Sequence, residues 1–260
     1  GGSLKHSRID RRAAIGGLAL IAASALATPS AGRGQEWSWP ERGENLQVLP
    51  ADFPAERLSA VMRGFTRALG VRCSYCHVGE EGQPLSSYDF ASDDNPMKDT
   101  ARTMYRMLGV INDTLATIDP SGPKAVNMWC HTCHRGRPRP TTLDEELAEV
   151  HEAEGIDATL AAYRELRERF YGRGAFDFGE NVLNMFGYSL LEEGMAADAV
   201  AIFQLNAEQY PGSGNAWDSL GEGYLATGDE ARAIESYEKS LELDPENENA
   251  REKLTEIRGG

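Results

Sequence analysis

The sequence predicts an all-α protein built from two parts. Apolar residues recur at spacings of three and four along several segments, and a pattern of residues in the last third returns after 34 positions. Charge separates the two parts, because residues 144–260 hold nine basic and 27 acidic residues, a net charge of −18, whereas residues 28–143 are balanced. The net charge of −15 for the whole chain argues against a nucleic-acid-binding protein.

Residues 1–27 have the features of an export signal. Four basic residues come before an apolar run that ends in Ala25-Leu26-Ala27, a cleavage pattern. The uncharged run continues to Gly32, with Trp37 and Trp39 just beyond, so an uncleaved membrane anchor is the alternative. In both cases the following residues, beginning with a linker at 28–44, are expected in the periplasm or outside a bacterial cell, and any membrane attachment would be through the N-terminus.

All four cysteines lie in two copies of one motif, Cys-x-x-Cys-His. The first copy is Cys73 to His77 and the second is Cys130 to His134. This spacing is typical of c-type haem, in which two thiols bond to the vinyl groups and the next histidine ligates the iron. A zinc ribbon needs the two pairs about 15–20 residues apart, whereas 53 residues separate Cys76 from Cys130. The sequence therefore predicts two covalent haems c, with His77 and His134 as proximal ligands.

Two predicted helices precede the motifs, and each has methionine on its apolar stripe. The first helix spans residues 54–69 and carries Met62, eleven positions before Cys73. The second helix spans residues 96–118 and carries both Met104 and Met107, between which spacing alone does not decide. Only His131 and His151 remain as other histidines after the signal, so methionine is the better candidate for the sixth position of each iron.

Four stretches between residues 45 and 142 resemble a known family. They are Asn45-Leu46-Gln47-Val48-Leu49-Pro50, Met62 through His77, Ala101-Arg102-Thr103-Met104 with Ile111-Asn112, and Cys130 through Gly136. The segment is similar to the cytochrome subunit family of purple-bacterial photosynthetic reaction centres. The resemblance implies units of a helix with an axial methionine, a turn and a haem-binding segment. By position, Met62 would ligate the first iron and Met104 the second, with Met107 as the fallback. The family pattern has four haem motifs and this chain has two.

The acidic half contains a 34-residue repeat. Seven residues of the first copy, from Leu183 to Pro211, return at equivalent positions from Trp217 to Pro245. This period is typical of tetratricopeptide repeats, in which each unit is a pair of antiparallel helices. We expect a dihaem domain at residues 45–143, a helical connector at 144–179 that includes a helix at 157–171, and repeats at 180–260 that end in a cap helix at 247–257.

These features predict an exported dihaem cytochrome that transfers single electrons and is not an enzyme. The repeats are expected to mediate association with redox partners or with further copies of the chain. One alternative is a subunit of a head-to-tail multihaem assembly, in which Arg135, Arg137 and Arg139 would meet the acidic repeats of a neighbour. Another is a peroxidase-like enzyme with one open iron site, for which His151 and Glu145 are the available acid-base residues.

Overall fold

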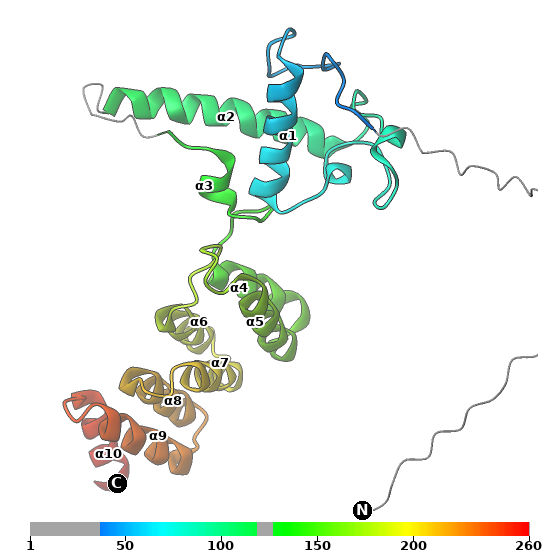
Figure 1. Ribbon diagram of the computed structural model, residues 1–260. Helices are drawn as coiled ribbons and strands as arrows, with labels where there is room; N and C mark the ends of the chain where they lie inside the picture. Colours follow the sequence, from blue (N-terminus) through cyan, green and yellow to red (C-terminus); the bar gives the residue numbers. More distant parts are fainter. Residues whose placement is uncertain (1–36, 119–126, 260) are drawn as a thin grey trace, which may run out of the picture. The chain divides into compact units, whose positions relative to one another are not determined.

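The computed structural model describes residues 37–118 and 127–259, and these residues confirm the all-α fold (Figure 1). The predicted export signal or anchor lies outside them, as does most of the predicted linker. No strand occurs among the described residues, where pairing is limited to two isolated bridges. The helices are α1 (Ala55–Leu69), η1 (Cys73–Tyr75), η2 (Leu85–Ser87), α2 (Pro96–Ile118), α3 (Cys130–His134), α4 (Leu143–Glu154), α5 (Ile156–Phe170), α6 (Glu180–Glu192), α7 (Ala196–Gln209), α8 (Gly214–Ala226), α9 (Glu230–Leu243) and α10 (Glu248–Gly259).

The two helices predicted before the motifs both form. Pro54 is the N-cap of α1, and Gly70 ends the helix in the left-handed conformation with φ +68°. The helix α2 begins at Pro96 and ends at Ile118, as the apolar spacing predicts. Within the described ranges, no helix combines the length and the apolar character that crossing a membrane requires.

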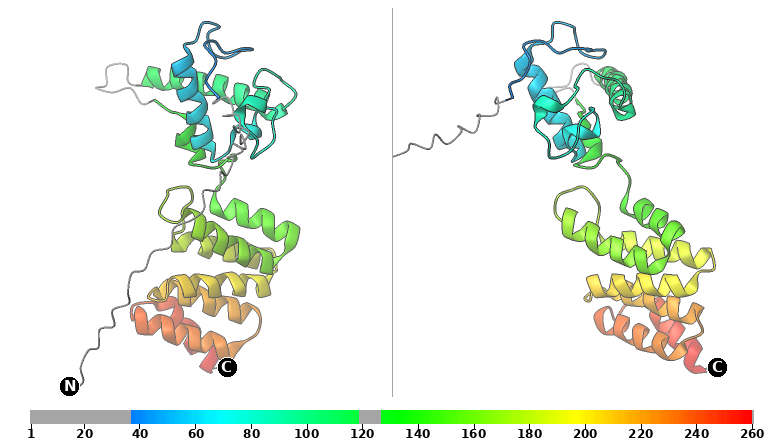
Figure 2. Two further views of the ribbon diagram at one scale, coloured as in Figure 1. Left: turned by 45° about the vertical axis from the view of Figure 1, so that its right-hand side comes forward. Right: turned by 90° about the vertical axis from the view of Figure 1, so that its right-hand side faces the viewer.

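The acidic half forms the predicted helical repeats. Helices α6 to α9 pack in sequence, each against the next, with α4 and α5 before them and α10 after them (Figure 2). A small residue lies at the same point of each pair: a Cβ on Gly187 would come within 2.4 Å of Phe203, and one on Gly221 within 2.7 Å of Tyr237. Close approach of paired helices at these glycines explains why the 34-residue pattern includes them.

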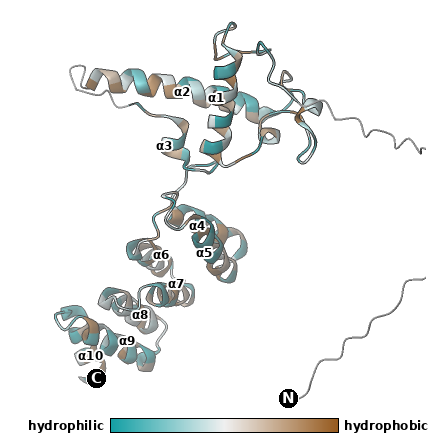
Figure 3. Ribbon diagram, in the orientation of Figure 1, coloured by the Kyte–Doolittle hydropathy of each residue, from teal (hydrophilic) through white to brown (hydrophobic). Residues whose placement is uncertain are grey.

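The buried apolar core is unevenly distributed along the chain. One cluster runs from Leu143 to Leu254 through α4–α10 and contains nearly all the fully buried apolar side chains of the described residues. Among described residues before Leu143, only Leu49, Leu58 and Ala68 are buried hydrophobics, although apolar positions lie along α1 and α2 (Figure 3). The segment that carries the cysteine motifs therefore packs little of its apolar surface against itself.

Candidate haem-binding sites

The first motif folds as a single tight turn. The carbonyl of Cys73 accepts hydrogen bonds from the N–H groups of Cys76 (3.2 Å) and His77 (3.0 Å), so the two thiols and the ring come from one short stretch. The His77 ring lies edge-on to Phe90, with centroids 5.1 Å apart. Burial lowers the pKa of His77, and the positive charge of Lys98 lowers it further. The neutral imidazole is the form that ligates iron.

The second motif is the short helix α3. Thr132 closes its first turn, because its side chain accepts from the Trp129 N–H (3.1 Å) while its own N–H donates to the Trp129 carbonyl (2.8 Å). His134 Nδ1 donates to the carbonyl of Arg137, 3.0 Å away. A proton held on Nδ1 leaves Nε2 free for a metal, the arrangement usual for ligating histidines.

All four cysteines are free thiols in the structure, so neither motif is closed by a disulfide. Burial raises the pKa of both Cys76 and Cys130, and in each case the neighbouring thiol of the motif adds to the effect. Among the described residues, no three His, Cys, Asp or Glu side chains gather as a metal site.

The candidate methionines lie on two different helices, α1 and α2. Met62 is half-buried in α1, whose Phe65 stacks on Trp129 with centroids 6.0 Å apart. Met104 and Met107 lie on α2 and are 42% and 50% exposed. The Phe65 ring also lies edge-on to the Tyr105 ring of α2, with centroids 6.2 Å apart. Phe65 of α1 therefore contacts both α2 and Trp129, the residue before the second motif. The assignment of Met62 to the first iron and Met104 to the second stays a prediction.

Asn112 fastens α2 to the residues before the second motif. Its side-chain amide donates to the Met128 carbonyl (3.0 Å), and its side-chain oxygen accepts from the Met128 N–H (2.7 Å). This pairing holds the chain two residues before Cys130 against the middle of α2. The helical pattern does not reveal it, because a polar residue on an amphipathic helix ordinarily faces water.

Exposed apolar side chains are concentrated in the segment that carries the two motifs. Of the nine large hydrophobic residues that are exposed among the described residues, seven lie between residues 75 and 129: Tyr75, Val78, Met104, Met107, Val110, Ile118 and Trp129. Exposed apolar side chains that lie together on a surface ordinarily mark a site for a ligand or partner. The surface, the paired thiols and the free Nε2 of His134 together fit a large, flat, apolar group with an iron centre.

The residues considered for other functions make contacts within the chain. His151 Nε2 lies 2.8 Å from Asp198 Oδ2 in the repeat region, and Glu145 caps the start of α4 through the Thr142 N–H (2.8 Å). His131 is exposed on α3. The structure thus brings neither His151 nor Glu145 to a motif.

The three arginines after the second motif are engaged locally too. Arg135 Nη1 donates to the carbonyl of Gly174 (2.8 Å), and Arg139 pairs with Glu149. Arg137 is 7% exposed and its guanidinium lies 3.8 Å from the centre of the Phe176 ring. These contacts favour internal neutralisation of the basic residues over a free basic edge.

Comparison with known proteins finds one similar family for the part with the cysteine motifs and another for part of the repeats. Residues 41–165 match the family described as photosynthetic reaction centre cytochrome C subunit, and residues 214–247 match the tetratricopeptide repeat family. Cytochrome c-554 of Chloroflexus aurantiacus is 30% identical over 139 residues, which cover 47% of this chain and 31% of that protein. The chain thus spans about a third of the length of this curated relative.

Two solved structures of repeat domains are also similar. They are the first TPR domain of human RPAP3 and the first TPR of Spaghetti (RPAP3) bound to an HSP90 peptide. Each is 18% identical to this chain, with a TM-score of 0.32. Each match covers 45% of this chain, and the matches cover 87% and 88% of the two solved chains. At this score the likeness supports no conclusion about geometry. On the family matches, residues 41–165 are similar to the photosynthetic reaction centre cytochrome C subunit and residues 214–247 to tetratricopeptide repeats, so a cytochrome-like part and a repeat part occur in one chain.

Proposed function

We propose that the chain is an exported dihaem c-type cytochrome that transfers single electrons, acts in the periplasm or outside the cell, and associates with partners through its repeats. The similarity to cytochromes c supports an electron-transfer role with covalent haem c. Two motifs support two haems. The observation that carries the proposal is the set of exposed apolar side chains in the segment that holds both motifs, a segment with little buried core of its own.

Each residue has a distinct role in this proposal. Haem c supplies an iron that cycles between ferrous and ferric states, and His/Met ligation favours a high reduction potential. The thiols of Cys73, Cys76, Cys130 and Cys133 form the thioether bonds. His77 and His134 ligate the irons, with Met62 and Met104 on the opposite sides and Met107 as the alternative to Met104.

His134 is the best supported of these ligands, because the Arg137 carbonyl fixes its ring orientation through Nδ1. The apolar surface around the motifs would exclude water from the haem edges. Exclusion of water stabilises the less charged, ferrous form and so raises the potential further.

Haem stoichiometry is the first test of the proposal. Mass spectrometry of the protein made with a c-type maturation system is expected to show two covalent haems. Replacing both cysteines of one motif by alanine, as C73A/C76A or C130A/C133A, is expected to remove one haem each. A wild-type chain with one haem or none contradicts the proposal.

Carbon monoxide binding to the reduced holoprotein tests the ligands and separates a carrier from a peroxidase-like enzyme. We expect no binding to the wild type, because both irons are proposed to be six-coordinate. Met62→Leu and Met104→Leu should each open one haem to carbon monoxide, whereas the matched variant Met107→Leu should not. Binding in the Met107 variant alone would transfer the ligand role to that residue, and rapid binding at one haem of the wild type would favour the enzyme.

The partner role rests on the repeat region. Residues 144–260, which include the repeats, have a net charge of −18, which favours a basic partner surface, and Met185 of α6 is 72% exposed. Sedimentation of the holoprotein over a range of salt concentrations tests self-association, including the head-to-tail assembly. A monomer at every concentration of protein and salt contradicts self-association and leaves a separate redox protein as the partner.

A further inference from the structure

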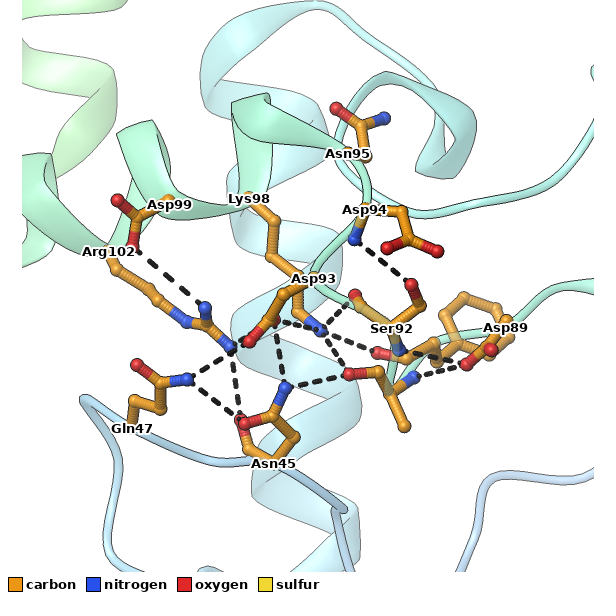
Figure 4. Close-up of polar contacts among 12 residues, drawn as sticks. Asn45, Gln47, Asp89, Ser92, Asp93, Asp94, Asn95, Lys98, Asp99 and Arg102 are labelled. Atoms are coloured by element: carbon orange, nitrogen blue, oxygen red, sulfur yellow. Dashed lines mark hydrogen bonds and ion pairs between the residues drawn. The ribbon is translucent and has the colours of Figure 1, made fainter.

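A compact polar cluster lies between the first motif and α2. We use the name Asp93 cluster for Asn45, Gln47, Asp93, Lys98 and Arg102 (Figure 4). Asp93 Oδ1 accepts from Arg102 Nη2 (2.8 Å), Asn45 Nδ2 (2.8 Å) and Lys98 Nζ (3.2 Å), and Oδ2 accepts from Gln47 Nε2 (3.2 Å). One carboxylate therefore joins the segment at 45–47, the loop before α2 and the first turns of α2.

The two cations of the Asp93 cluster are buried, although Asp93 itself is not. The side chains of Lys98 and Arg102 are 11% and 8% exposed, while that of Asp93 is 47% exposed. Lys98 Nζ also donates to the carbonyls of Phe90, Ala91 and Ser92 at 3.1, 2.9 and 2.7 Å. A buried cation without its partners is costly, so these contacts hold the loop at 90–93 in one conformation.

One side of the cluster reaches the first motif. Phe90, whose carbonyl binds Lys98, packs against the His77 ring. Asn95 follows the loop directly, and its side-chain amide donates to the carbonyls of Ser74 (3.3 Å) and Tyr75 (3.2 Å), inside the first motif. The loop fixed by Lys98 and Asp93 therefore also supports the turn that presents His77.

The other side of the cluster reaches the helix proposed to serve the second haem. Lys98 and Arg102 belong to α2, and Met104 follows Arg102 by two positions. Arg102 Nη2 also donates to the Asn45 carbonyl (3.3 Å), which fixes this turn of α2 against the segment at 45–47. Asp93 is thus linked, through Lys98 and Arg102, both to the loop beside the first motif and to the turn of α2 that precedes Met104.

We propose that Asp93 is a positioning residue that couples the two haem sites, fixing the first motif and the Met104 turn of α2 relative to each other. The inference rests on the proposed dihaem function. Asp93 acts through Lys98 and Arg102. Its loss would leave buried Lys98 without a carboxylate and Arg102 with only the longer ion pair to exposed Asp99 (4.0 Å), so the loop and the helix would move together.

The test compares Asp93→Asn with Asp94→Asn in the holoprotein. The two substitutions remove the same charge from adjacent exposed residues, but Asp94 joins the loop through its backbone N–H, which donates to Ser92 Oγ (3.0 Å). Redox titration followed by visible spectroscopy measures both potentials, and the far-red absorption band of ferric haem reports methionine ligation.

We expect D94N to raise both reduction potentials slightly, because it removes one negative charge, and to leave the methionine band unchanged. D93N should shift both potentials more than D94N does and should weaken the methionine band. Equal shifts with an intact band in both variants would overturn the coupling role. The failure of the dihaem function itself is distinguishable, because it appears as missing haem in the wild type.

Gln47→Ala keeps the test decisive where D93N fails to fold. It removes one bond to Asp93 and no charge, so it should weaken the methionine band and shift both potentials in the same direction as D93N, by less. Potentials and spectrum identical to those of the wild type in Q47A would overturn the inference.

Discussion

Gly70 shows how one residue determines the junction between the end of α1 and the residues that follow the second motif. It ends α1 with φ +68°, and a Cβ at this position would lie 2.1 Å from the carbonyl oxygen of Gly136, just beyond the second motif. The Gly136 N–H donates to the carbonyl of Ala68 at 2.8 Å, so the end of α1 and the end of the second motif are in direct contact. Only glycine satisfies both the backbone conformation and this approach.

Gly70→Ala is therefore expected to destabilise the cytochrome region by about 3 kcal/mol, as measured by urea unfolding of the holoprotein. Gly82→Ala is the matched control, because Gly82 has φ +87° and a Cβ added there would meet nothing within 4 Å. The control substitution should lower the free energy of unfolding only by the backbone strain, about 1–2 kcal/mol. Equal losses in the two variants would show that the approach of Gly136 is unimportant.

Asp218 is a carboxylate buried in the repeat region. It is 8% exposed, its Oδ2 accepts from Asn249 (2.9 Å), and its Oδ1 is buried without a hydrogen-bond partner. Burial raises its pKa; the bond from Asn249 opposes this effect and the charge of Glu222 adds to it. A folded-state pKa above the unfolded value means that the folded state binds the proton more tightly, so this residue destabilises the fold at neutral pH.

Asp218→Asn should therefore increase the free energy of unfolding at pH 7, by about 1 kcal/mol. The penalty in the wild type is complete above the folded pKa and disappears as the pH falls towards the unfolded value near 4. The advantage of the variant should accordingly shrink between pH 7 and pH 4.5 in urea titrations. Glu252→Gln, which alters an exposed carboxylate of α10, is the control and should show no such trend.

At the scale of elements, α2 has some features that the sequence predicts and others that only the tertiary structure shows. Its bounds follow from Pro96 and from apolar spacing, which are local properties of the chain. The contacts of Asn112 with Met128 and of Asp93 with Asn45 join residues 16 and 48 positions apart. Such pairs depend on the tertiary fold, so helical periodicity predicts the helix and its methionines but not the polar contacts that hold it.

The Asn112 contact can be tested through the element that it holds. Asn112→Ala removes a partner from both the N–H and the carbonyl of Met128, which should cost about 1–3 kcal/mol in urea unfolding of the holoprotein. Thr114→Ala, on the same helix, loses only a bond to the Val110 carbonyl (2.8 Å) and should cost less than about 0.5 kcal/mol. Equal stability of the two variants would contradict the role of Asn112 in holding α2.

At the scale of the whole molecule, the two halves differ in how they achieve stability. The repeats bury a continuous apolar cluster, whereas the segment before Leu143 buries three apolar side chains among its described residues and exposes many near its motifs. Residues 41–165 are similar to a cytochrome family, and residues 214–247 are similar to tetratricopeptide repeats. The sequence predicts this division well, because the motifs, the 34-residue period and the change in charge are all visible without a structure.

Arg137 connects the second motif with the residues just before α6. Its Nη2 donates to the carbonyls of Thr141 (2.7 Å) and Ala175 (3.1 Å), and its guanidinium lies over Phe176. Burial lowers the pKa of this arginine, while the charge of Glu146 opposes the shift. A planar guanidinium that satisfies two carbonyls and an aromatic face is not replaced by other residues.

Arg137→Ala should therefore lower the free energy of unfolding by about 2–4 kcal/mol, because it leaves buried carbonyls without donors and removes a cation-π contact. Arg139→Ala, two positions on, breaks an ion pair whose side chains are 60% and 50% exposed, so it should destabilise the fold far less, because water screens an exposed pair. Urea unfolding followed by far-ultraviolet circular dichroism measures both. If the two variants were equally stable, the buried contacts of Arg137 would contribute nothing to joining the motif to the helices that follow. A large loss confined to R137A would instead show that the contacts of Arg137 with Thr141, Ala175 and Phe176 stabilise the fold.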